Sequence, residues 1–163
     1  MILYHGSNLE VREPRLLYSR QALDFGAGFY LTSSVGQARG WARRTTRVRG
    51  TGAPTVSAYA TTPAWDELRI LHFATANRQW LDFVTAHRRQ RPPEEVYDVV
   101  AGPVANDRTM DVLNVYFSGT ITAEMALQLL LPQKLNDQWA LKTPAALAAV
   151  QWTGTIDDEP QSS

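Results

Sequence analysis

Hydrophobic positions change their period along the chain, which predicts short strands interleaved with helices. Residues 2–7 are apolar and β-favouring, and a glycine interrupts them. The apolar residues 35, 38, 41 and 42 are spaced as on one face of a helix, and the two serines just before them suit an N-cap. The same criteria predict strands at 2–7, 29–32, 56–61, 68–73, 96–101, 138–142 and 150–154, helices at 35–45, 77–89, 109–117, 122–131 and 143–149, and a Gly-rich turn at 47–54.

This irregular order of elements predicts an α+β fold. A doubly wound sheet would need regular repeats of strand and helix, which the pattern lacks. The segment 26–28, Gly-Ala-Gly, has no third glycine and precedes a predicted strand, so the dinucleotide-binding fingerprint does not apply. We expect a single domain over 1–155, and an acidic polar tail over 156–163 that is disordered.

The composition excludes several kinds of chemistry. The 163 residues include no Cys, which excludes disulfides, cysteine-ligated metals and a thiol nucleophile. The three histidines, His5, His72 and His87, are scattered, so we expect no metal site. No apolar run approaches the roughly 20 residues that span a bilayer, and the first residues lack the basic start of a secretory signal. We therefore expect a cytoplasmic protein without a membrane partner.

Charge is balanced overall but divided along the chain. Residues 1–91 carry 13 Arg against six acidic residues, and residues 92–163 carry three basic against ten acidic residues. Five arginines lie in or just after the helix predicted at 35–45, namely Arg39, Arg43, Arg44, Arg47 and Arg49. This basic stretch suits a nucleic acid or an acidic protein. It is equally typical of a solvated helix face, and the excess of arginine over lysine in the whole chain is typical of a genome of high GC content.

His5, Gly6 and Ser7 close the first predicted strand. Alternation along a strand points His5 and Ser7 the same way, and Gly6 brings bare backbone groups within reach of a ligand. A hydrolase pairing of Ser7 with His5 would need a strained turn around the serine, which this segment lacks. A histidine that only packs at a strand end fits the pattern as well.

The segment 24–32, Asp-Phe-Gly-Ala-Gly-Phe-Tyr-Leu-Thr, contains two glycines that allow a turn and a strand that presents Tyr30. Trp41 follows on the next predicted helix. Two aromatic rings on adjacent elements can enclose a flat ring, and a cationic pyridinium suits them because stacking then adds a cation–π attraction of about 0.5–2 kcal/mol. Both residues also fit an ordinary core.

Gln138 begins a late predicted strand, within the segment 136–141, Asn-Asp-Gln-Trp-Ala-Leu. Its amide can accept a hydrogen bond from a sugar hydroxyl and donate one to it, although a solvated glutamine at a strand start is the simpler interpretation. Asp24 and Asp107 are carboxylates that could lie near an acceptor substrate, and each also suits a loop cap.

These three segments, in this order, resemble the ADP-ribosyltransferase superfamily on the side of its poly(ADP-ribose)-polymerase-like members. The superfamily pattern has His-Gly-Ser/Thr on the first strand, Gly-x-Gly-apolar-Tyr before a helix with a second aromatic, and Asn-Glu-Tyr-apolar on a late strand. The counterparts here are 4–7, 25–32 with Trp41, and 136–141. The resemblance extends to about Trp152 and implies split mixed or antiparallel sheets with flanking helices.

A group of small stand-alone bacterial domains of this superfamily is the nearest match. Its signatures correspond here to 24–32, to Gln-Ala-x-x-Trp-Ala at 37–42 and to Gly-Pro-Val-Ala-Asn-Asp at 102–107. Several members of that group are linked to toxin–antitoxin pairs. The resemblance therefore implies a toxin that an antitoxin protein neutralises.

The resemblance also implies how NAD, as a substrate and without a metal, would be held. His5 would bond the adenosine-side ribose. The Gly6 backbone would hold the nicotinamide carboxamide, with Ser7 beside it. Arg20 would meet the pyrophosphate, although a plain surface arginine fits the sequence as well, and Gly28 would belong to the NAD-binding turn.

Tyr30 and Trp41 would stack on the two faces of the nicotinamide, and Gln138 would stand where the superfamily has its catalytic glutamate. An amide cannot ionise, so Gln138 cannot act as a general base or carry negative charge toward an oxocarbenium-like transition state. It can still bond the 2′-hydroxyl of the nicotinamide-side ribose. The resemblance thus implies His5, Tyr30 and Gln138 as the catalytic set and argues against polymer elongation.

The activity implied is mono-ADP-ribosyl transfer from NAD to a protein or nucleic-acid acceptor, with NAD hydrolysis as a further reaction. Two other functions stay open at this point. One is a module that binds NAD or ADP-ribose without turnover, as the glutamine suggests. The other is an NAD-dependent RNA 2′-phosphotransferase, which would need several basic side chains converging on one phosphate.

Overall fold

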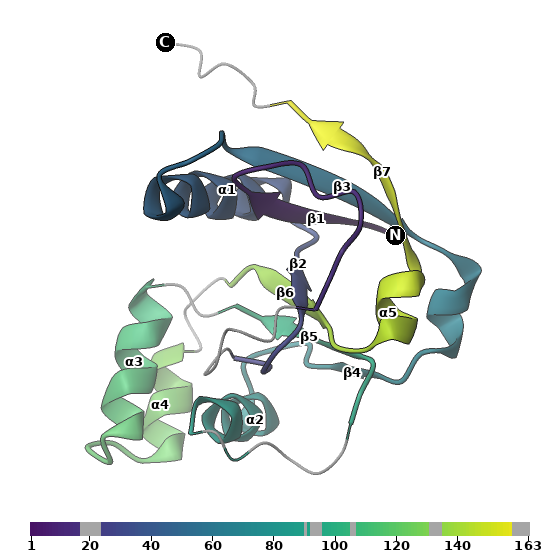
Figure 1. Ribbon diagram of the computed structural model, residues 1–163. Helices are drawn as coiled ribbons and strands as arrows, with labels where there is room; N and C mark the ends of the chain where they lie inside the picture. Colours follow the sequence, from purple (N-terminus) through teal and green to yellow (C-terminus); the bar gives the residue numbers. More distant parts are fainter. Residues whose placement is uncertain (17–23, 90, 92–95, 105–106, 131–134, 158–163) are drawn as a thin grey trace.

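The computed structural model describes residues 1–16, 24–89, 91, 96–104, 107–130 and 135–157, and their strands form two sheets (Figure 1). Sheet A is antiparallel and contains, in order, β1 (Ile2–Ser7), β3 (Thr55–Thr61) and β7 (Val150–Ile156). Sheet B contains, in order, β2 (Phe29–Leu31), β6 (Asp137–Leu141), β5 (Val99–Pro103) and β4 (Ile70–His72), and it is mixed because β4 and β5 run parallel. The predicted α+β class is confirmed.

Helices pack on both sheets. Helix α1 (Val35–Arg49) lies against sheet A. Three helices gather beyond sheet B, namely α2 (Arg78–Arg88), α3 (Asp107–Phe117) and α4 (Ala123–Leu130) (Figure 1). The 3-10 helix η1 (Pro63–Glu67) and the short helix α5 (Pro144–Ala148) lie on the opposite side of the molecule from α3 and α4 (Figure 1). No described helix is both long and apolar enough to cross a membrane.

Local capping explains where the helices begin. The Ser34 side chain accepts a hydrogen bond from the backbone of Gln37 and starts α1. Asn77 does the same for Trp80 at the start of α2, as predicted. The turn predicted at 47–54 is wrong for its first three residues, because α1 continues to Arg49. Arginine is a good helix former, and Gly50 supplies the left-handed residue (φ 68°) that ends the helix.

Other boundaries are set by strand partners rather than by local pattern. β5 covers 99–103 instead of 96–101 because β6 pairs with that stretch, and β4 shrinks to the three residues that pair with β5. β7 extends to Ile156, which the sequence analysis assigned to the tail, because Val56 of β3 pairs with it.

The alternation of side chains divides the core into three clusters. Between the sheets, Leu3 and Tyr59 of sheet A meet Phe29 and Leu141 of sheet B. The opposite face of sheet A packs on α1 through three buried residues, Ala38, Ala42 and Val56. The third cluster lies between sheet B and helices α2 to α4 and includes Phe25, Trp80, Leu81, Val84, Val100, Leu113, Leu130 and Ala140.

In the described part of the chain, one backbone pair bridges the two sheets. The Tyr4 N–H donates to the Thr32 carbonyl at 2.8 Å, and the Thr32 N–H donates to the Tyr4 carbonyl at 2.9 Å. If this antiparallel pairing continued, the next facing residues would be Gly6 and Tyr30. The strands instead diverge there and leave a split, which we call the β1–β2 opening.

Candidate functional site

The candidate site is built around the β1–β2 opening. Because Tyr4 and Thr32 direct their backbone groups at each other, the alternation of a strand also directs the N–H and C=O of Gly6 and Tyr30 into the opening. Gly6 is buried, and no hydrogen bond to its backbone on this side is found among the described residues. Buried backbone groups are nearly always paired, so Gly6 presents a donor and an acceptor that suit a ligand.

His5 precedes Gly6 and spans the opening by a hydrogen bond to β2. Its Nδ1 lies 2.8 Å from the carbonyl oxygen of Tyr30, and its ring stacks on Phe29 with centroids 4.2 Å apart. The carbonyl can only accept, so Nδ1 carries the proton. Ser7 is buried and donates to the Oδ1 of Asn8 at 3.3 Å. The structure therefore brings His5, Gly6 and Tyr30 together, while the expected bond between His5 and a ribose stays a prediction.

The absence of a side chain at Gly6 has a cause that the sequence analysis missed. A Cβ at this position would lie 1.9 Å from the carbonyl oxygen of Ala38 and 2.8 Å from the backbone nitrogen of Ala42. Helix α1, rather than a ligand, fills that space. The feature of Gly6 that suits a ligand is the direction of its backbone groups.

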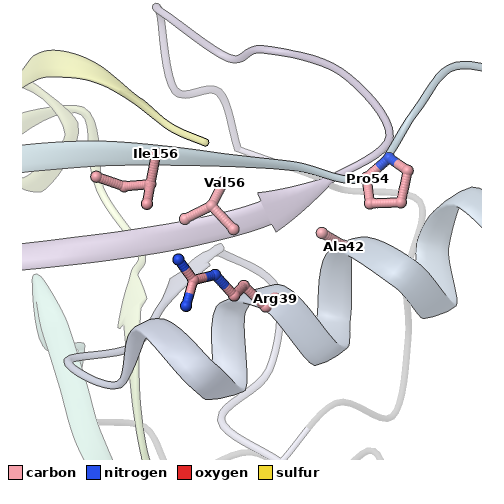
Figure 2. A pocket seen from close by; sticks show the side chains of 5 residues that line it. All are labelled: Arg39, Ala42, Pro54, Val56 and Ile156. Atoms are coloured by element: carbon pink, nitrogen blue, oxygen red, sulfur yellow. The ribbon is translucent and has the colours of Figure 1, made fainter. Parts of the chain in front are cut away.

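One flank of α1 faces away from the opening. Figure 2 shows a hollow there, lined by Arg39, Ala42, Pro54, Val56 and Ile156. Its volume of about 10 Å³ fits roughly one water molecule. This hollow lies toward β3 and β7, so it is unrelated to the β1–β2 opening.

Trp41 lies on the opposite flank of α1, as the helical spacing from Ala38 and Arg39 requires. Gln37 shares that flank, and its Oε1 accepts from Asn136 at 3.0 Å, directly before β6. The Trp41 flank therefore faces sheet B across the opening. No direct ring contact between Trp41 and Tyr30 is found in the described part of the chain, so the nicotinamide sandwich stays a prediction.

Tyr30 has a second role, which the sequence analysis did not predict. Its hydroxyl donates to the carbonyl of Gly26 at 2.6 Å and accepts from the N–H of Phe25 at 3.2 Å. The turn that it holds needs glycine, since Gly26 has a φ of 80°. Burial raises the pKa of Tyr30 well above its usual value, so the hydroxyl stays neutral and its hydrogen bonds persist.

Gln138 is almost completely buried, with 4% of its surface exposed. Its Nε2 donates to Oδ2 of Asp24 at 3.1 Å and to the carbonyl of Pro103 at 3.3 Å. Asp24 is paired in turn with Arg88, whose Nε and terminal nitrogen reach Oδ1 at 2.8 and 2.5 Å. Gln138 lies at the start of β6, one residue after its first residue, but it is not the solvated glutamine that the simpler interpretation expected, because Asp24 and Pro103 bond the buried amide.

Asp137 and Lys142 hold β6 to its surroundings, and the sequence analysis singled out neither of them. Asp137 accepts from Thr32, from the backbone and side chain of Ser33, and from Trp139. Burial opposes its ionisation, but these four hydrogen bonds outweigh burial and lower the pKa of Asp137. An aspartate directly before an apolar strand gives no signal of such partners, which come from distant elements.

Lys142 donates to the carbonyls of Phe25 and Ala27, the latter at 3.1 Å. Burial lowers the pKa of Lys142 to about 8. Gly28 lies on the same turn, where a Cβ would come within 2.9 Å of the Leu141 carbonyl, so this glycine lets the turn pack on β6. Arg20 and the side chain of Asp107 fall outside the described residues.

Comparison with known families supplies one match. Residues 1–152 match the family described as a protein of unknown function, DUF3990. The chain belongs to the DUF3990 family. No curated protein and no solved structure matches it. The match covers the whole β1–β2 opening and the Arg88–Asp24–Gln138 group, so these features lie within the DUF3990 domain. In the described residues of this DUF3990 chain, no group of three or more His, Cys, Asp or Glu is placed to hold a metal ion.

Proposed function

We propose that this DUF3990 domain binds NAD in the β1–β2 opening and transfers its ADP-ribose to a macromolecule, with an ADP-ribosyltransferase-like fold. The observation that carries the proposal is the buried backbone of Gly6, which lies opposite Tyr30 and has no bond on that side in the described chain. A carboxamide such as that of nicotinamide offers one donor group and one acceptor, which complement this N–H and C=O.

Three side chains around the opening support the same ligand. Trp41 lies on the flank of α1 that faces sheet B, and Tyr30 borders the opening from β2. Gln138 is on the same face of sheet B as Tyr30, because Tyr30 pairs with Ala140 two residues further along β6. An aromatic pair and an amide acceptor suit a pyridinium and its neighbouring ribose.

The reaction breaks the bond between nicotinamide nitrogen and C1′ of the ribose. Nicotinamide leaves with the bonding electron pair, C1′ gains positive charge, and the acceptor forms a new bond to C1′ and loses its proton to solvent. Burial keeps Tyr30 neutral and Gln138 cannot ionise, so neither provides a general base. Rate enhancement would rest on orientation, which can contribute about 7–11 kcal/mol, and on a nucleophile that is reactive without a base.

The activity test uses NAD labelled in its adenine, incubated with the protein and with cell lysate, RNA or DNA. We expect nicotinamide release and a labelled acceptor. Trp41→Ala should lower both at least tenfold, whereas Val48→Ala on the exposed side of the same helix should not. Absence of release and labelling, with no effect of Trp41→Ala, would count against transfer.

One observation favours a second function, a module that holds NAD or ADP-ribose without turnover. The position that resembles the catalytic glutamate is occupied by the non-ionisable Gln138. Calorimetry that detects saturable NAD binding, together with no release of nicotinamide, would select this module over the transferase.

We further propose that the transferase acts as a toxin in the cytoplasm and is neutralised by an antitoxin protein. The acidic and basic halves of the chain and the exposed Arg44 and Arg47 of α1 suit a charged partner or acceptor. Expression in a bacterial host should slow growth with the wild-type chain and less with Gln138→Ala. Equal growth of the two strains would contradict a toxin.

A further inference from the structure

Three residues, Arg88, Asp24 and Gln138, form a chain of hydrogen bonds that holds the Gln138 amide. Arg88 takes Oδ1 of the Asp24 carboxylate, which leaves Oδ2 for the Gln138 amide. The Pro103 carbonyl accepts a hydrogen bond from the same amide nitrogen, and it accepts a second one from the indole of Trp80 at 3.1 Å. Asp24 and Gln138 are both at least 94% buried, so water cannot replace these partners readily.

These partners fix the orientation of the amide. A carboxylate paired with an arginine and a backbone carbonyl both act as acceptors, so the NH₂ end of Gln138 must face them. Oε1 is then the end that points elsewhere, and no described residue donates to it. The side chain therefore has only an acceptor left to offer, so a ligand group that bonds it has to be a donor, such as a ribose hydroxyl.

We propose that Asp24 is a positioning residue that holds the Gln138 carbonyl toward the ligand and makes position 138 unsuitable for a carboxylate. This inference rests on the proposed function and names the part of NAD concerned, a ribose hydroxyl. A glutamate at 138 would place a second acceptor about 3 Å from the Asp24 carboxylate and beside the Pro103 carbonyl, with no proton to share. Two buried carboxylates at this separation cannot both ionise.

The first experiment measures urea unfolding without NAD between pH 4.5 and 8. It compares the wild type, Gln138→Glu, Asp24→Asn with Gln138→Glu, and Gln128→Glu, which adds the same charge on the exposed face of α4. At pH 7.5, Gln138→Glu should increase the unfolding constant at least about tenfold, the equivalent of one pKa unit. This loss of stability should become smaller as pH falls, because a proton on either carboxyl group supplies a hydrogen-bond donor between the two.

The double variant and Gln128→Glu should lack this pH dependence. Among the described residues, Arg88 on α2 and Tyr30 on β2 face Asp24, and burial raises the pKa of Tyr30 well above this range. His87 and Lys142, which lie beside Gly26 of the same turn, are present in all four proteins. Two results would overturn the proposal. Gln138→Glu could be as stable as the wild type at pH 7.5, or it could lose the same stability whether or not Asp24→Asn is also present.

The second experiment measures NAD affinity and the kcat and KM of nicotinamide release at pH 7.5. Gln138→Glu should weaken NAD binding at least about tenfold, and adding Asp24→Asn should recover most of that loss and raise kcat, because the glutamate can then ionise. Additive effects of the two substitutions would overturn the proposal. If the wild type itself neither binds nor cleaves NAD, the proposed function fails, and the unfolding data alone decide whether Asp24 fixes the amide.

A measurement on the wild type covers the case in which a variant does not fold. The side-chain NH₂ protons of Gln138 should exchange with solvent far more slowly than those of the exposed Gln128 in NMR spectra. Equal exchange rates for the two amides would show that the NH₂ end of Gln138 is not held, which contradicts the proposal.

Discussion

At the scale of single residues, the candidate site includes positions whose role cannot be recognised from the side chain alone. Gly6 carries no functional group, yet it has to be glycine for α1 to pack on β1, and its backbone faces the opening. His5 resembles a catalytic residue in the sequence, and in the structure it also bonds the Tyr30 carbonyl where β1 and β2 part. Substitutions can separate these packing roles from ligand roles.

Gly6→Ala should destabilise the fold by about 2–3 kcal/mol, near the upper end of overpacking costs. The added Cβ meets backbone atoms of α1, which cannot rotate away as a side chain could. Gly40→Ala is the matched control in the same helix, where an added Cβ meets no atom within 4 Å, and it should stabilise by about 0.5–1 kcal/mol. Chemical denaturation measures both, and an equal effect of the two substitutions would contradict the packing assignment.

Asp137→Asn should destabilise the fold by about 1.5–3 kcal/mol at neutral pH, because the charged acceptor of four hydrogen bonds is lost. The hydrogen bonds lower the pKa of Asp137 in the folded state, so its contribution is complete above the unfolded value of 3.8 and disappears as pH falls through the folded pKa. Urea unfolding at pH 7 and pH 2.5 should show a large difference from the wild type only at pH 7. The control Asp66→Asn on the exposed surface should change little at either pH.

At the scale of elements, the turn at 24–28 is held from three sides. The Tyr30 hydroxyl bonds Gly26, Lys142 bonds Phe25 and Ala27, and Arg88 bonds Asp24. The turn thus links β2, β6 and α2 beside the opening. A turn fixed by three elements can keep Asp24, and through it Gln138, in one position.

Burial lowers the pKa of Lys142 to about 8 in the folded state, below its ordinary value of 10.5. Between these values the unfolded chain binds more protons, so stability should rise as pH increases from 8 toward 10. Lys142→Met should remove this rise while leaving the Asp24–Arg88 pair intact. Thermal unfolding at pH 7.5, 8.5 and 9.5 tests it, and a wild-type profile that is flat or falls over this range would contradict the assignment.

At the scale of the whole molecule, the two sheets share one core cluster, and among the described residues the backbone pair Tyr4–Thr32 joins them at the opening. A ligand that bonds Gly6 on one sheet and Gln138 on the other would connect the two sheets. Such a ligand should stabilise the molecule as a whole rather than one element.

NAD at 100 times its dissociation constant should raise the free energy of unfolding by about 2.7 kcal/mol. The thermal midpoint of the wild type should rise accordingly, whereas Trp41→Ala should need a higher NAD concentration for the same rise. Val48→Ala should behave as the wild type does. An unchanged midpoint at millimolar NAD, for all three proteins, would contradict binding in the opening.

Much of the local structure could be predicted from the sequence, because caps and periodicity depend on neighbouring residues. Ser34 and Asn77 start their helices as expected, and β1 has the predicted bounds. Boundaries such as those of β4, β5 and β7 differed, because they depend on how far a partner strand extends. At the site, the sequence indicated His5, Gly6, Tyr30 and Gln138, but it gave no sign of Asp137 or Lys142, whose partners lie far away along the chain.

The kinds of elements, their order and the α+β class follow from the amino-acid sequence alone, since hydrophobic period, capping and turn residues act within short windows. Three features emerge only when the chain is folded: β1 and β2 part after the Tyr4–Thr32 pair, α1 fills the space beside Gly6, and Asp24 bonds the Gln138 amide. These features depend on strand register and on contacts between residues as far apart as Asp24 and Gln138, which are 114 positions apart along the chain. At such distances the free energy of folding depends on packing and on pairing buried polar groups rather than on local preference.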